Sequence, residues 1–122
     1  MRYMILVKAT PESERGDMPP PELLAEMGAY HAELARAGVL LDGAGLRATA
    51  YGFRVAIAAD GARTVADGPF VESQGLLAGY TLIQVRSRAE ALEWARRYPN
   101  PRGPGLPAEI EVRPLFEEED FA

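Results

Sequence analysis

The chain has 122 residues, 48% hydrophobic and 25% charged, which is the size and balance of one globular domain with a single core. Its net charge of −5 argues against nucleic acid or an anionic membrane surface as the main partner, because both attract basic patches. The lack of cysteine excludes disulfides, thiolate metal sites and cysteine nucleophiles. We therefore expect a single domain over residues 1–122, with 116–122 as an acidic tail.

The first segment, "RYMILVKA", is rich in β-forming residues and stops at Thr10-Pro11, so it predicts a strand. Both of its alternating sets are apolar: Tyr3, Ile5 and Val7 on one side, Met4 and Leu6 on the other. This pattern predicts a strand buried on both faces. The apolar run is too short for a signal peptide or a membrane span, so we expect a cytoplasmic protein.

A polar loop, "PESERGDMPPP", is predicted next, and its final prolines suit a helix start. The helix is expected from about Pro20 to Ala37, with Gly38 as its C-terminal stop. Its apolar residues recur at helical spacing and form one stripe, made of Leu23, Met27, Tyr30 and Leu34.

Several β segments follow the helix. Strand character at 39–41 precedes a turn-prone Asp42-Gly43 and a possible bulge at Gly45. "YGFRVAIAADGARTVA" alternates, which places Tyr51, Phe53, Val55 and Ile57 on one face, and its Asp60-Gly61 predicts a hairpin turn. A further strand, "AGYTLIQV", precedes the second helix.

The second helix is predicted to start at Ser87, which lies three residues before Glu90 at capping-box spacing, and to close before Pro99. Trp94 and Tyr98, four residues apart, are expected in the core. A Pro/Gly loop and a last strand, "AEIEVRPLF", precede the acidic tail.

This order predicts an α+β fold, an antiparallel sheet of four or five strands with two helices on one face. The other face then needs a cover, since the first strand is apolar on both sides. We therefore predict a homodimer that packs sheet to sheet.

The segments "DGPFVESQGLLAGYTLIQVRSRAEALEWARRYP" and "EIEVRPLFEEEDF" resemble the YCII-related, DGPF-domain family, and "MRYMILVKA" and "HAELARAGVLLDGAGL" resemble its opening strand and first helix. The resemblance implies the ferredoxin-like, dimeric α/β-barrel fold but no established reaction. The wider superfamily includes muconolactone isomerase-like enzymes, a dehydrochlorinase and small monooxygenases. Members often occur beside extracytoplasmic-function sigma factors, which implies a regulatory or stress context.

Two departures from the family pattern bear on function. The usual loop continues through an acid to a Lys-Glu pair, and here Gln74 and Gly75 stand in those places. The helix-borne histidine proposed for the short YCII branch falls near Met27, one turn before His31. His31 therefore does not inherit that role by alignment.

The loop "DGPFVES" holds the first candidate site residues. Asp67 is either a turn-forming residue or a catalytic carboxylate at the mouth of a barrel pocket. Glu72 is either a second carboxylate of that site, where it binds the substrate, or a solvated loop residue. Phe70 is a costly residue to leave in water, so we expect it to dock and hold the loop. About eleven residues separate Ala66 from Ala78, more than a connection needs.

Other candidates come from the helix and the strands. His31 has the side chain best suited to proton transfer near neutral pH, or it is structural and points toward the sheet edge. Arg54 and Arg113 hold an anionic substrate or form cross-strand ion pairs. We expect no metal site, because the chain has one histidine and its carboxylates are scattered. We also expect no cofactor, because the sequence contains no nucleotide-binding motif.

Three functions remain open from the sequence. One is a cofactor-independent isomerase, lyase or dehydrochlorinase that uses Asp67, His31 or both. The second is a small-molecule-binding or regulatory module, and the third is a structural dimeric subunit. The tail, with Phe116 and Phe121 around four consecutive acids, is expected to reach the partner subunit.

Overall fold

The computed structural model describes residues 1–72 and 75–122. Its strands are β1 (Arg2–Lys8), β2 (Leu40–Gly45), β3 (Phe53–Ile57), β4 (Arg63–Asp67), β5 (Leu77–Gln84) and β6 (Ile110–Pro114). Its helices are α1 (Pro11–Glu14), α2 (Pro21–Arg36) and α3 (Arg88–Arg96), with 3-10 turns η1 (Thr49–Tyr51) and η2 (Glu118–Phe121).

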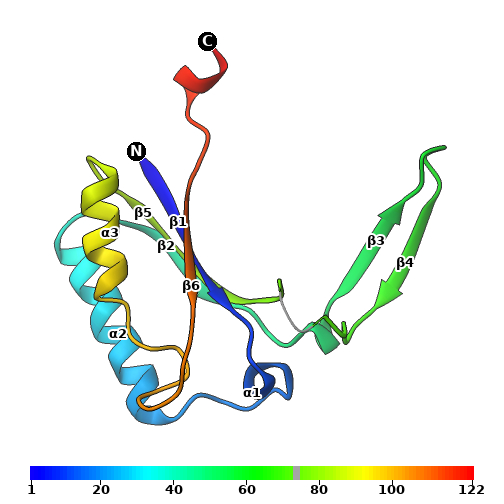
Figure 1. Cartoon of the computed structure of the whole chain (residues 1–122), viewed down its shortest axis with the longest axis horizontal. Helices are drawn as coiled ribbons and strands as arrows, with labels where there is room; N and C mark the ends of the chain where they lie inside the picture. The colour runs from blue at the N-terminus through cyan, green and yellow to red at the C-terminus, as the bar shows by residue number, and fades with distance from the viewer. Residues whose placement is uncertain (73–74) are drawn as a thin grey trace.

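The main sheet has four antiparallel strands in the order β2-β5-β1-β6, and α2 and α3 lie together on one of its faces (Figure 1). With α1, the 3-10 turns and the arm described below set aside, the elements run strand, helix, strand, strand, helix, strand, which is the ferredoxin-like arrangement. The α+β fold predicted from the sequence is confirmed.

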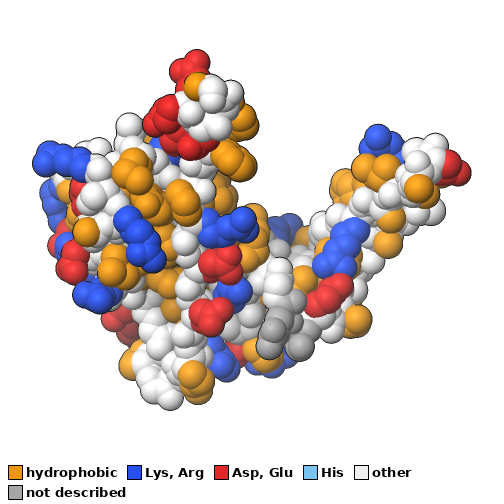
Figure 2. Space-filling model, turned by 45° about the horizontal axis from the view of Figure 1, so that its top comes forward, with side chains coloured by type: hydrophobic (Ala, Val, Ile, Leu, Met, Phe, Trp, Pro, Cys, Tyr) orange, Lys and Arg blue, Asp and Glu red, His pale blue; other side chains and the backbone are white. Residues whose placement is uncertain are grey.

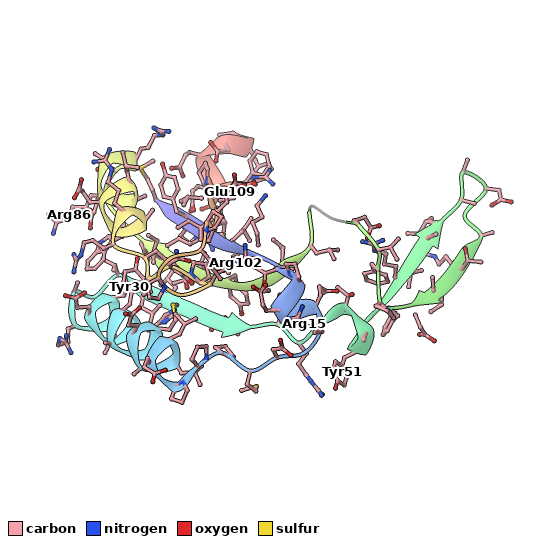
Figure 3. The ribbon with its side chains drawn as sticks, turned by 60° about the horizontal axis from the view of Figure 1, so that its bottom comes forward. Arg15, Tyr30, Tyr51, Arg86, Arg102 and Glu109 are labelled. Atoms are coloured by element: carbon pink, nitrogen blue, oxygen red, sulfur yellow. The ribbon has the colours of Figure 1, made fainter. Side chains whose placement is uncertain are left out.

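The core lies between this sheet and the two helices. Ile5, Leu34, Thr81 and Ile83 are fully buried there. Tyr30 lies on the side of α2 that faces α3, where its hydroxyl donates to the Trp94 carbonyl at 2.6 Å (Figure 3). The predicted stripe on the first helix is confirmed, with Met27 only half-buried, and Trp94 and Tyr98 pack against the core as predicted.

The opposite face of the main sheet carries no helix in the described chain. The β1 and β5 residues with their side chains on this open face are half-buried, namely Met4, Leu6, Tyr80 and Leu82. On the helix side, Tyr3 and Ile5 are buried. The first strand is therefore apolar on both faces, as predicted, but a single chain covers only one of them.

The hairpin predicted around Asp60-Gly61 forms, but it does not join the main sheet. Strands β3 and β4 make a separate two-stranded sheet that projects away from the body as an arm, residues 53–67 (Figure 1). Gly61 turns the chain at its tip with φ of 89°. The arm is closed at its base, where the Gly68 N–H donates to the Gly52 carbonyl at 2.9 Å.

Three local expectations are wrong. The segment expected to be only a polar loop contains α1, which Thr10 caps by accepting from the Ser13 N–H at 3.1 Å. Asp42-Gly43 lies inside β2 instead of forming a turn, because pairing with β5 overrides the local turn preference. The irregularity of β2 falls between Leu40 and Asp42, not at Gly45.

No helix in the described residues is long and apolar enough to cross a membrane. The cytoplasmic location expected from the sequence stays a prediction.

Candidate functional site

A groove of about 610 Å³ lies at the end of β1, between α1 and the loop that follows β4. One wall comes from the chain that leaves β1 and enters α1, including Lys8, Thr10 and Glu14. The other comes from Pro69 to Glu72 and from Leu76, and Glu109 lies at the edge. The volume is in the range of small-molecule sites, and the groove is open to solvent on one side.

Thr49 holds the two walls together. Its backbone N–H donates to Glu14 Oε1 at 3.1 Å and its hydroxyl donates to Glu14 Oε2 at 2.6 Å. The same hydroxyl oxygen accepts from the Phe70 N–H at 3.0 Å. One threonine therefore ties η1, α1 and the DGPF loop into a single unit.

Gly68 brings the loop against this unit. A Cβ built on Gly68 would lie 1.8 Å from the Thr49 carbonyl oxygen, so only glycine permits this approach. The following Gly68–Pro69 peptide bond is cis. The close approach of Gly68 to Thr49 sets the loop against η1, and Phe70, two residues further on, lines the groove.

Phe70 is half-buried beneath the guanidinium of Arg54, which lies 3.8 Å from the ring centroid. Arg54 Nη1 also donates to Glu72 Oε1 at 2.6 Å. The hydrogen bond from Arg54 holds the pKa of the Glu72 carboxyl below its usual range. The structure thus brings together Arg54, Phe70 and Glu72, while the docking of Phe70 into the body or the partner stays a prediction.

Lys8 supplies a cation to the groove. Its Nζ lies 3.3 Å from Glu111 Oε1 and 3.4 Å from Glu109 Oε1. These carboxylates, with Glu111 contributing most, raise the pKa of the Lys8 ammonium. The groove therefore combines one ammonium and three carboxylates, Glu14, Glu72 and Glu109, with apolar side chains such as Phe70 and Leu76.

Asp67 lies outside the groove. It is exposed at the end of β4, directly across the hairpin from Phe53, and it is not among the residues that line the groove. The expectation that it faces a pocket shared with the first long helix is not met in the single chain. The groove is lined instead by α1, and the catalytic role of Asp67 stays a prediction.

His31 lies under the sheet, apart from the groove. Its Nδ1 is 2.9 Å from the Met27 carbonyl, so it donates there, and its Nε2 is 2.9 Å from the buried Thr81 hydroxyl. A Cβ on Gly43, in the edge strand β2, would lie 3.1 Å from Nε2. His31 therefore points toward the sheet edge, as the structural alternative expected, and both ring nitrogens have partners.

Arg113 is also apart from the groove. Its side chain is 71% exposed and its Nε lies 3.9 Å from Glu111 Oε2, an ion pair that contributes little to stability. Within the described ranges, no group of three histidine, aspartate or glutamate side chains could hold a metal ion. Gln74, one of the two departures from the family loop, lies outside the described residues.

An ion pair anchors α1 from below. Arg102 reaches from the loop before β6 to α1, where its Nη2 donates to Glu12 Oε1 at 2.8 Å (Figure 3). This hydrogen bond lowers the pKa of the Glu12 carboxyl to about 2. Arg102 also lines a smaller cavity, together with Pro107 and Glu109.

The loop, the helices and the sheet together fit one known family. A model of the YCII-related domain matches residues 1–116. The chain belongs to the YCII-related domain family. Members of this family are typically dimeric and have no established common activity. No curated protein matches the sequence.

Some residues of this YCII-related site were not predicted from the sequence. Glu14 and Thr49 join the groove walls. Glu14 lies in the segment predicted to be a polar loop, and Thr49 lies between two predicted β segments. The Thr10-Pro11 pair was a usable signal for α1, because threonine caps helices and proline suits their first turn. No local pattern predicts the contact between Thr49 and Phe70.

Proposed function

We propose that this YCII-related protein binds a small organic molecule in the groove between α1 and the DGPF loop. The observation that supports this most is the Thr49 unit, which fixes both walls with hydrogen bonds of 2.6 to 3.1 Å. A connecting loop needs no such bracing. A preformed concave site with a few placed polar groups is the usual form of a ligand pocket.

The lining favours a ligand with an apolar body and hydrogen-bond donors. Phe70 and Leu76 offer apolar surface, while carboxylates outnumber the single ammonium. Glu72 is ionised at neutral pH, and the hydrogen bond from Arg54 lowers the pKa of its carboxyl further. Glu72 is therefore an acceptor for such a ligand and a poor proton donor.

Acid–base catalysis by Asp67 and His31 has less support. Neither residue lines the groove, and the two nitrogens of His31 are engaged with Met27 and Thr81. Arg113 pairs weakly with Glu111, away from the loop. A binding or regulatory module fits these positions better, and a link to a sigma factor remains an expectation from the family alone.

The working unit of this proposal is a homodimer. A second copy packed on the open face would cover Met4, Leu6, Tyr80 and Leu82, which the single chain leaves half-exposed. Sheet-to-sheet packing of this kind gives the dimeric α/β barrel of the family. Sedimentation of a monomer at micromolar concentration would contradict it.

Binding is tested by recording amide NMR shifts while a library of small aromatic amines and alcohols is added. We expect shifts to concentrate at Thr10, Glu14, Thr49 and Phe70. Val71 lines the groove and is 96% exposed, so Val71→Trp should block binding without a folding cost. Leu92→Trp, at an exposed position on α3, is the matched control.

Loss of binding in Val71→Trp with retention in Leu92→Trp would support the groove as the site. Equal binding by both variants, or shifts confined to residues around His31, would place the ligand elsewhere and contradict the proposal.

A further inference from the structure

The arm exposes an apolar face to solvent. Register pairs Val55 with Val65 and places Phe53 and Ile57 on the same side of the hairpin, with Asp67 and Arg63 opposite them at the two ends of this face. The four apolar side chains are between 44% and 67% exposed. The space-filling view shows hydrophobic side chains along the arm, which stands clear of the body (Figure 2).

An arm of this kind is not stable by itself. A two-stranded sheet in water is marginal at best, and it needs a third strand or a packed surface to persist. Within the described chain, β3 and β4 pack mainly against each other and only weakly against any other helix or strand. The alternation of apolar residues on β3 also gives the arm one face suited to burial and one suited to water.

We propose that the arm docks, through the face of Phe53, Val55, Ile57 and Val65, onto a second copy of this chain. The arm then extends the sheet-to-sheet interface and clasps the partner. This inference rests on the homodimer proposed above, not on the ligand groove.

The size of the patch favours a second copy over an unrelated partner. Four such side chains offer roughly 150–300 Å² of apolar area at their observed exposure. A stable interface buries about 800 Å² on each partner, so the arm is too small to hold a partner alone. It can only enlarge a larger interface, and the open sheet face supplies the remaining apolar surface.

The position of the arm agrees with this arrangement. It leaves the body beyond the sheet and stands on the side away from α2 and α3 (Figure 1). A body seated on the open face would lie between the sheet and the arm. By two-fold symmetry each copy would both extend an arm and receive one, which doubles the added contact.

The test compares two aspartate substitutions at neighbouring positions of β3. Val55→Asp places a charge on the apolar face, while Ala56→Asp places the same charge on the opposite face, across from Thr64. Sedimentation equilibrium of the full chain gives the dimer dissociation constant of each. We expect Val55→Asp to raise it about tenfold or more, and Ala56→Asp to leave it near that of the wild type.

A second variant guards against local unfolding of the arm. Arg54 pairs with Ala66 across the hairpin, so residues 55–65 can be replaced by a two-glycine turn that shortens the arm and keeps Arg54 over Phe70. We expect this variant to keep the far-ultraviolet circular dichroism of the body and to dimerise as weakly as Val55→Asp.

The outcomes separate the two proposals. A wild-type dimer whose dissociation constant is unchanged in Val55→Asp and in the arm deletion would overturn the clasp and leave the sheet-face dimer standing. A wild-type monomer would overturn both. Ligand binding at the groove is read independently by the NMR titration.

Discussion

At the scale of single residues, the contacts of Gly68 and Phe70 explain two of the four positions of the DGPF tetrapeptide. Gly68 has no Cβ because the Thr49 carbonyl occupies that space. The aromatic ring of Phe70 provides the surface on which the Arg54 guanidinium stacks. The cost of exposing Phe70 predicts that its ring is at least partly covered, but no sequence pattern predicts the contact of Gly68, because the position of Thr49 depends on the folded chain.

Gly68→Ala should destabilise the protein by about 1–3 kcal/mol, because the new methyl group would overlap the Thr49 carbonyl and force the loop away. Urea unfolding measures the change. Gly28→Ala is the matched control: Gly28 lies within α2 with no atom near its Cβ position, so alanine there should stabilise by about 0.5–1 kcal/mol. Similar effects of the two substitutions would refute the close approach.

A second residue-level prediction concerns the buried pair of His31 and Thr81. Thr81→Val keeps the shape of the side chain but removes the hydroxyl that His31 Nε2 contacts at 2.9 Å. The stability should fall by about 1–3 kcal/mol, since a half-buried ring nitrogen loses its partner. Thr81→Ser keeps the hydroxyl and should recover part of the loss in urea unfolding. If Thr81→Val has the same free energy of unfolding as the wild type, the hydrogen bond does not contribute to stability.

At the scale of elements, the sequence predicted those with strong periodicity. The stripe on α2 and the alternation of β1 are set by residues close in the chain, and both formed where expected. The cap of α3 also formed, with Ser87 accepting from the Glu90 N–H at 3.2 Å. Helix α1 was missed because its four residues carry no apolar period and depend on the Arg102 contact.

The anchor of α1 gives a prediction about pH. The pKa of Glu12 is about 2 in the folded chain and 4.5 when unperturbed, so its ionised form favours folding. This stabilisation is present above pH 4.5 and is lost as the pH falls toward 2. The difference in stability between wild type and Glu12→Gln should therefore shrink over that range.

Urea unfolding of both proteins at pH 6, 4 and 2.5 measures this difference. Glu72 and Glu117 also have lowered pKa values, owing to Arg54 and Arg2, but both proteins share them and they cancel. A difference that stays constant with pH would show that Glu12 titrates normally and does not anchor α1.

The C-terminal element is another case where local pattern was insufficient. Phe116 and Phe121 were expected to dock on apolar surface, but in the single chain their rings contact each other, with centroids 5.3 Å apart. Glu117 accepts from Arg2 Nε at 2.9 Å. Whether the tail contacts a partner stays a prediction, tested by comparing the dimer dissociation constant with and without residues 117–122.

At the scale of the whole molecule, the need for a second copy could be predicted from the sequence, but the site could not. Apolar residues on both faces of β1 are visible in the chain order, so the need for a cover could be predicted. The groove depends on Glu14, Thr49 and Phe70, which are distant in sequence and meet only through the fold. For the same reason the predicted pair of Asp67 and His31 did not come together.

The most direct test is a crystal structure of the dimer after soaking with the compounds that shift amide resonances in solution. We expect ligand density between α1 and the DGPF loop, against Phe70 and within hydrogen-bond distance of Glu14 or Glu72. A dimer in which partner side chains fill that groove, or a ligand bound only at another place, would contradict the proposed site.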